Sequence, residues 1–178
     1  MEFNDLLQKR RSIRKFLPQP VDRALVETLL RQALTAPSAR NTRTTSFLAV
    51  DNRETIARMA AMRDYGSAFM AEAPVAVVVL GDTAGSDLWR ENAAIAATLL
   101  QLAAVNAGLA SCWVHVNGRP RVKELPDGEQ AMDYLRTLLP IPDGREALCV
   151  IALGYSDFQP KPLPPYTGDP QILWPARL

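Results

Sequence analysis

The spacing of apolar residues along the chain follows two periods, one typical of helices and one typical of buried strands. Helical spacing predicts helices within residues 3–9, 23–36, 53–62, 87–107 and 130–139. Local signals mark their ends: Asp22 is a good N-cap for the second helix, and Pro37 stops the same helix. Runs rich in β-branched residues predict strands over 46–50, 75–80, 111–116 and 147–153. Helices and strands therefore alternate, and we expect a sheet covered by helices.

One predicted helix is apolar nearly all round, between Ala93 and Ala107, and Gly108 follows it as a C-terminal cap. A helix without a polar face is buried on every side. We therefore expect either a central helix or a helix shared with a second subunit. The apolar run is too short to cross a membrane, and Thr98 and Gln101 interrupt it.

The composition changes beyond Tyr155, where six of the last 24 residues are proline. Proline at that density excludes regular structure, yet an apolar cluster at 172–174 needs burial. We therefore expect a single domain over residues 1–155 and a proline-rich C-terminal arm over residues 156–178 that packs on a partner subunit.

Charge and cysteine usage exclude several classes of protein. The chain has 178 residues with 20 basic and 19 acidic side chains, so it has no global field to recruit nucleic acid or an anionic membrane. Its single histidine and two cysteines, Cys112 and Cys149, argue against a multi-ligand zinc site, and we expect both thiols in the core. We predict no metal. The first 16 residues lack the apolar run of a secretion signal, so we expect a cytoplasmic protein.

Two short segments carry candidate chemistry. The run KRRSIRK, residues 9–15, holds five basic side chains, which fit either a solvated surface that binds nucleic acid or a cradle for a phosphate group. The loop APSARNT, residues 36–42, follows a helix and exposes backbone amides, and Asn41 can both donate and accept hydrogen bonds. Neither the dinucleotide-binding nor the P-loop fingerprint is present in the sequence.

In order and spacing, these segments resemble the nitroreductase family of FMN-dependent oxidoreductases. The resemblance spans nearly the whole chain and rests on RRSIRKF (10–16), APSARNT (36–42), AEAPVAVVVL (71–80), LAAVNAGLASCWV (102–114) and IALGYSDFQPKP (151–162). It implies an α+β fold with a mixed, mostly antiparallel sheet flanked by helices. It also implies an intertwined homodimer with two FMN sites at the subunit interface.

The resemblance assigns the candidate cofactor contacts. They are Arg10, Arg11, Ser12 and Arg14 in the first segment, Pro37, Ser38, Ala39 and Asn41 in a loop that reaches the flavin from the partner subunit, and Lys161 after the last strand. His115 and Val116 fall where the family's backbone lies against the reactive edge of the flavin. The flavin N5 atom is then the reactive centre, no side chain is essential for catalysis, and His115 lines the pocket.

The chain departs from the family pattern at three places. Arg43, followed by two threonines, stands where the family usually has Gln-Pro-Trp after the loop asparagine, and it either faces the flavin or lies on the surface. A second basic residue beyond Lys161 is missing, and His115 replaces a small residue. These changes leave the expected fold intact, and they concern which substrate is used and how the protein adjusts the reactivity of the flavin.

The resulting prediction is an FMN-dependent oxidoreductase. It passes electrons from NADH or NADPH, by a ping-pong mechanism, to a nitroaromatic, quinone or similar small acceptor. One alternative keeps the flavin but changes the reaction, to flavin remodelling or reductive dehalogenation. A second alternative is a nucleic-acid-binding module that uses the basic 9–15 run, against which the neutral net charge argues.

Overall fold

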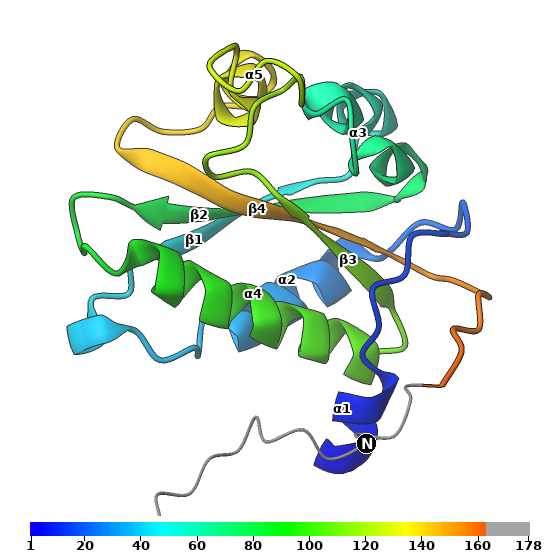
Figure 1. Ribbon diagram of the computed structural model, residues 1–178. Helices are drawn as coiled ribbons and strands as arrows, with labels where there is room; N and C mark the ends of the chain where they lie inside the picture. The colour runs from blue at the N-terminus through cyan, green and yellow to red at the C-terminus, as the bar shows by residue number, and fades with distance from the viewer. Residues whose placement is uncertain (163–178) are drawn as a thin grey trace, which may run out of the picture.

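A computed structural model describes residues 1–162, so most of the predicted C-terminal arm lies outside the described residues (Figure 1). The α-helices are α1 (Phe3–Lys9), α2 (Arg23–Ala33), α3 (Arg53–Met59), α4 (Trp89–Asn106) and α5 (Ala131–Leu138). The strands are β1 (Thr45–Val50), β2 (Val75–Asp82), β3 (Ala110–His115) and β4 (Arg145–Gly154). Short 3₁₀ turns occupy Ala39–Asn41, Ala60–Met62 and Ala68–Glu72. Every predicted helix and strand is present, with small shifts at the ends.

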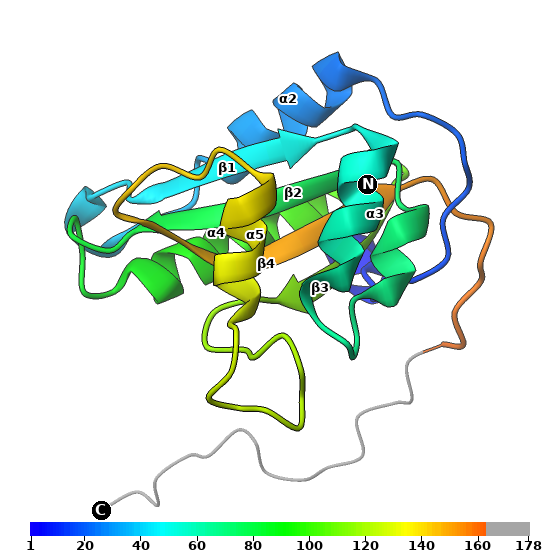
Figure 2. The same ribbon diagram turned by 90° about the horizontal axis from the view of Figure 1, so that it is seen from above.

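The strands form one sheet in the order β1-β2-β4-β3, with antiparallel pairing throughout. Helices α2 and α4 cover one face of the sheet and α3 and α5 cover the other (Figures 1 and 2). The only parallel pairing in the described part of the chain is an isolated bridge between Ser12 and Ser111. The predicted α+β fold, with a mostly antiparallel sheet flanked by helices, is confirmed.

The central strand β2 divides the core into two layers. Its alternate side chains Val75, Val77 and Val79 pack with α2 and α4, while Val78 and Leu80 pack toward α3 and α5. None of these five is more than 3% exposed, because a strand with helices on both faces turns every side chain into one layer or the other. The prediction of a strand buried on both faces is confirmed.

Helix α4 begins at Trp89, two residues after the predicted start, because Ser86 accepts hydrogen bonds from Leu88 and Trp89 in a turn just before it. Its inner face is buried, but Ile95 is 41% exposed and Thr98 is also exposed on the outer face. The alternative of a helix enclosed within one chain is therefore wrong. A helix shared with a second subunit stays a prediction. Within residues 1–162, no helix has the length and apolar character needed to cross a membrane.

Gly81 near the end of β2 lets the ring of Trp89 approach the sheet. A Cβ at this position would stand 2.4 Å from Trp89 Cε3, and that ring is only 4% exposed and has no room to withdraw. We expect Gly81→Ala to lower the free energy of unfolding by about 1–3 kcal/mol, the usual effect of overpacking. Urea denaturation measures it. Gly128→Ala is the control, because its contacts at 3.2 Å lie in an exposed loop that can yield, and an equal loss there would contradict the explanation.

Candidate functional site

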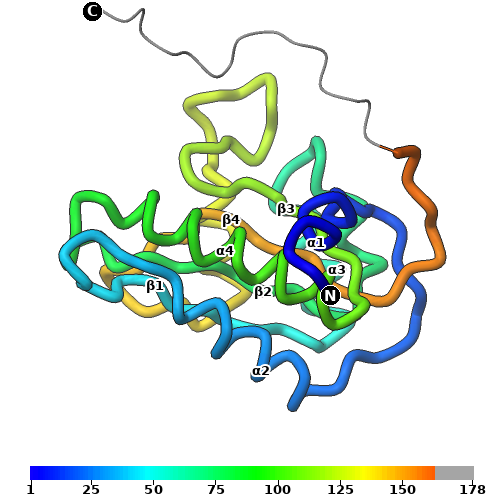
Figure 3. The backbone as a smooth tube through the Cα atoms, turned by 90° about the horizontal axis from the view of Figure 1, so that it is seen from below, coloured from blue at the N-terminus to red at the C-terminus, as the bar shows by residue number. Residues whose placement is uncertain are grey.

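The basic N-terminal run lies in an extended segment beside the start of β3 and the end of β4 (Figures 1 and 3). The Ile13 amide donates to the Ser111 carbonyl at 3.0 Å, and the Leu17 amide donates to the Tyr155 carbonyl at 2.8 Å. Side chains alternate in extended backbone. Ile13 is therefore buried, and its neighbours Ser12 and Arg14 are exposed on the other side.

A basic cavity of about 520 Å³ opens at this end of the molecule. Its lining residues among positions 1–162 are Arg10, Arg11, Ser12, Arg14, Phe158, Pro160 and Lys161, and these include no carboxylate. The Arg11 guanidinium donates to the Lys161 carbonyl, and this hydrogen bond fastens the segment after β4 to the N-terminal run. The structure thus brings together predicted site residues that lie 150 positions apart in the sequence. Forked arginine donors, an ammonium and a hydroxyl fit the three acceptor oxygens of a phosphate monoester.

The second predicted segment forms a tightly held loop after α2. Arg40, Asn41 and Arg43 have positive φ angles of 50°, 55° and 48°, a conformation that non-glycine residues rarely adopt. Side chains hold the loop: Ser38 Oγ accepts from the Arg43 amide at 3.0 Å, and Asn92 Oδ1 accepts from the Ala39 amide at 2.9 Å.

Asn92 is the part of this arrangement that sequence reasoning missed. It lies on α4, is 3% exposed, and its amide nitrogen also donates to Thr44 Oγ1 at 3.0 Å. Asn92 therefore holds both ends of the loop, at Ala39 and at Thr44. The available signal was a polar side chain one position before an otherwise apolar helical run.

The loop and the backbone segments that line the basic cavity lie at opposite ends of α4 (Figures 1 and 2). One chain therefore does not bring the loop residues together with the basic cavity. The predicted residues on the loop side are Pro37, Ser38, Ala39, Asn41 and Arg43. Pro37, Ser38 and Arg43 line a smaller cavity of about 190 Å³.

His115 is the last residue of β3, the edge strand of the sheet. Its carbonyl points away from β4 and accepts a hydrogen bond from Arg63 Nη1 at 2.8 Å. The next residue, Val116, is fully buried, and its amide donates to the Leu148 carbonyl at 2.9 Å. The Val116 amide thus already has a protein acceptor, and of the two predicted residues His115 is the one placed at the open edge.

Burial and two cationic side chains disfavour the protonated form of the His115 imidazole. Burial lowers its pKa below the ordinary 6.5, and the positive charges of Arg119 and Arg63 lower the pKa further. The ring stacks on Trp113, with 6.2 Å between the ring centres. A group with such a pKa is deprotonated at pH 7 and is poorly suited to donate a proton there. The cysteines, by contrast, are core residues as predicted, since Cys112 is 1% exposed and Cys149 is fully buried.

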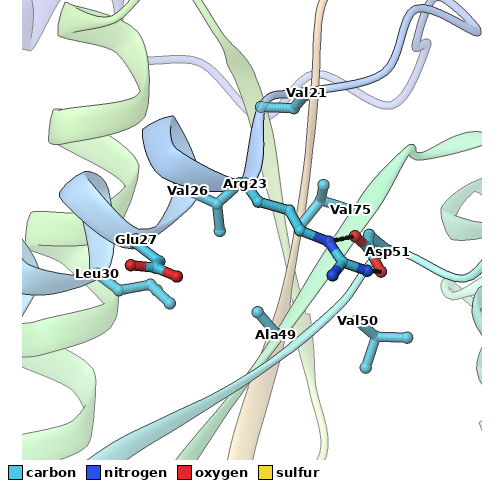
Figure 4. Close-up of a pocket in the computed structure, with 9 residues that line it drawn as sticks. All are labelled: Val21, Arg23, Val26, Glu27, Leu30, Ala49, Val50, Asp51 and Val75. Carbon is cyan, nitrogen blue, oxygen red and sulfur yellow. Dashed lines mark hydrogen bonds and ion pairs between the residues drawn. The ribbon is translucent and has the colours of Figure 1, made fainter.

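A further depression of about 290 Å³ lies between α2 and β1 (Figure 4). An ion pair in it joins Arg23 to Asp51, through contacts of 2.5 and 3.0 Å, and the guanidinium lowers the pKa of that carboxyl. The remaining walls are mostly aliphatic, such as Val26 and Ala49. Because the two charges satisfy each other and no predicted site residue lines this depression, we place the candidate site at the basic cavity and the β3 edge.

The fold is α+β, and the basic cavity at the edge of its antiparallel sheet offers cationic side chains suited to an anionic group. Comparison with known proteins identifies the class more closely. The model of the nitroreductase family matches residues 7–63 and 60–155, and the chain belongs to this family. It is therefore an oxidoreductase, as predicted.

Individual relatives agree with this membership. A provisionally named NADH dehydrogenase/NAD(P)H nitroreductase from Methanothermobacter thermautotrophicus is 31% identical over 158 residues, covering 87% of this chain and 78% of the relative. The structure of an FMN-dependent nitroreductase from Clostridium difficile R20291 superposes with a TM-score of 0.87 and 34% identity, over 97% of this chain and 98% of that one. A provisionally named NADH oxidase from Clostridium acetobutylicum superposes with a TM-score of 0.82 and 25% identity, over 98% and 100%.

Proposed function

We propose that this protein is an FMN-dependent oxidoreductase that passes electrons from NADH or NADPH, by a ping-pong mechanism, to a nitroaromatic, quinone or similar small acceptor. The observation that carries the proposal is the basic cavity, in which Arg10, Arg14 and Lys161 converge without a carboxylate. When bound, FMN supplies the hydride and electron transfer, and the protein supplies binding, orientation and electrostatics.

The residues of the chain divide into four groups in this proposal, of which three lie at the basic cavity and the β3 edge. Arg10, Ser12, Arg14 and Lys161 hold the phosphate of FMN. Arg11 is a positioning residue, because its guanidinium is engaged by the Lys161 carbonyl and holds that segment in place. The backbone of His115, with Val116 behind it, faces the ring system at the β3 edge.

The loop of Pro37, Ser38, Ala39, Asn41 and Arg43 completes the site from a second copy of the chain. Two observations support a homodimer. The two groups of predicted contacts lie at opposite ends of α4 within one chain. The outer face of α4 also has an apolar depression lined by Ala94, Ile95, Thr98 and Leu99. Helix α1, which carries the exposed apolar residues Phe3 and Leu7, lies near the end of α4 (Figure 3). The arm over residues 156–178 is proposed to add to this interface.

The convergence of the basic run also bears on the nucleic-acid alternative. A nucleic-acid surface spreads its cations along an open face. Here the side chains of Arg10, Arg11 and Arg14 meet the segment after β4 around one cavity, which favours a small phosphate-bearing ligand. A purified protein that is colourless and binds DNA would support the nucleic-acid alternative, whereas a yellow protein supports the flavin.

Steady-state kinetics test the proposed function. Initial rates are measured with NADH and NADPH varied against a nitroaromatic and a quinone. A ping-pong mechanism predicts parallel lines in double-reciprocal plots, because the nicotinamide leaves before the acceptor binds. Intersecting lines would contradict the mechanism, and no oxidation of either nicotinamide with any acceptor would contradict the function.

His115 is predicted to tune the reaction without being its essential acid. A lost general acid lowers rates about 10²–10⁴-fold. Because the His115 pKa is lowered and its backbone survives a side-chain change, we expect His115→Ala to reduce turnover less than about tenfold at pH 7. Stopped-flow spectroscopy can follow flavin reduction and reoxidation separately. Complete loss of reoxidation by every acceptor, with FMN still bound, would make the imidazole a true proton donor.

A further inference from the structure

Arg63, which follows the 3₁₀ turn after α3, reaches the end of β3 with most of its donors unused. Nη1 donates to the His115 carbonyl at 2.8 Å, and the guanidinium stacks on the Tyr65 ring at 4.0 Å. Nε is buried without a partner, and Nη2 has no protein acceptor among residues 1–162. A buried donor without a partner is uncommon, and here it belongs to a cation at the rim of the candidate site.

Arg119 lies in the turn that follows β3 and His115. Its amide donates to the Val116 carbonyl at 3.0 Å, and its side chain is exposed. Within the described chain neither Arg63 nor Arg119 forms an ion pair, whereas Arg121, two positions on, contacts Glu129 at 2.7 Å.

Two cations without an ion pair among the described residues therefore lie at the end of β3, Arg63 on the His115 carbonyl and Arg119 in the turn that follows. Their charges are near enough to His115 to lower its pKa. Such a surface attracts anions and offers forked donors that match a carboxylate. The Tyr65 ring, on which the Arg63 guanidinium stacks, adds an aromatic surface beside the two cations.

We propose that Arg63 and Arg119 form a clamp that selects acceptors carrying a carboxylate attached to an aromatic ring. The proposal rests on the proposed function, since it assumes that the β3 edge faces the flavin. Beyond that function, it specifies that the preferred acceptor is negatively charged. His115 supplies a neutral ring beside the clamp. A neutral nitroaromatic lacks the group that the two arginines bind.

Nuclear magnetic resonance can test the clamp without turnover, because His115 is the only histidine of the chain and its imidazole signals are unambiguous. The FMN-loaded, oxidised protein is titrated with benzoate and with benzamide, its neutral counterpart. We expect benzoate to move the His115 signals saturably and benzamide to move them little. Arg119→Gln should weaken benzoate about fivefold, as for an exposed ion pair. Arg63→Gln should weaken it at least about tenfold, and Arg63→Lys should retain part of the affinity.

Arg31→Gln on α2 is the matched control, because it removes the same charge from an exposed helix face that contributes no residue to the clamp. Equal shifts with benzoate and benzamide, or an equal loss in Arg31→Gln and Arg119→Gln, would overturn the proposal. Nicotinamide mononucleotide provides a further arm. If it moves the signals while benzoate does not, the clamp binds the phosphate of the nicotinamide and the acceptor assignment is wrong. Failure of the proposed function would show separately, as a protein that binds no FMN or is not reduced by a nicotinamide.

Discussion

Replacing Arg14 with alanine is expected to weaken FMN binding about ten- to a hundredfold. Arg14 lines the basic cavity together with Lys161, and its guanidinium lies 5.7 Å from the centre of the Phe69 ring. A hydrogen bond to a charged group contributes about 1.5–3 kcal/mol, and each 1.4 kcal/mol is a factor of ten in affinity. Titration of the apo-protein with FMN, followed by flavin fluorescence, measures the change.

The neighbouring cation provides the control. Lys15 carries the same charge, but it stands over Phe158 and is not among the residues that line the cavity. Lys15→Ala should therefore change FMN affinity less than about threefold, as expected for an exposed charge. Equal losses of FMN affinity in the two variants would mean that Arg14 acts only through nonspecific electrostatic attraction and not through a direct contact with the phosphate. Riboflavin, which lacks the phosphate, should bind weakly to the wild type and be insensitive to Arg14→Ala. Tighter binding of riboflavin than of FMN would contradict the assignment.

Ile95→Glu is expected to separate the homodimer and to lower flavin occupancy with it. Ile95 lies on the outer face of α4, beside Ala94 and Leu99, and is 41% exposed in one chain. If a second copy covers this face, the substitution buries an unpaired carboxylate. That raises the dissociation constant of the dimer by more than about a hundredfold, since such a charge costs about 3–5 kcal/mol. Sedimentation velocity gives the number of chains, and the visible spectrum gives the bound flavin.

Leu125→Glu is the comparison for this variant. Leu125 is 60% exposed in the loop before α5, so it tests an apolar-to-charged change at an exposed site away from α4. We expect it to stay dimeric and loaded with flavin. A wild type that is monomeric and fully loaded would contradict the shared site outright. A dimer that persists in Ile95→Glu would move the interface to another surface.

The elements of the fold could be predicted from the sequence because local signals mark their ends. The Asp22 side chain accepts from the Ala24 amide, and Asn52 accepts from the Thr55 amide, as their positions before apolar runs indicate. Gly108 has a φ of 77°, as a C-terminal cap requires. The start of α4 could not be predicted in the same way, because it depends on a turn at Ser86 and on the packing of Trp89 under Gly81.

The site was only partly predictable, because its missing parts are long-range contacts. The cations at residues 10–14 were visible as a run, and the family resemblance supplied Lys161. The polar side chain of Asn92 in the sequence does not reveal that it accepts a hydrogen bond from the Ala39 amide of the loop, and nothing in the sequence indicates that Arg63 reaches the carbonyl of His115. Apolar periodicity showed that α4 lacks a polar face, but it could not say whether this chain or a second one covers Ile95.

Anaerobic titration with a nicotinamide tests the central claim most directly. Protein reconstituted with FMN is mixed, without oxygen, with one equivalent of NADH or NADPH, and the visible flavin band is recorded. A nitroaromatic or a quinone is then added. The proposed function predicts that at least one nicotinamide bleaches the band and that at least one acceptor restores it while being consumed in proportion. A protein that binds no FMN, or whose bound flavin keeps its band with both nicotinamides, would contradict it.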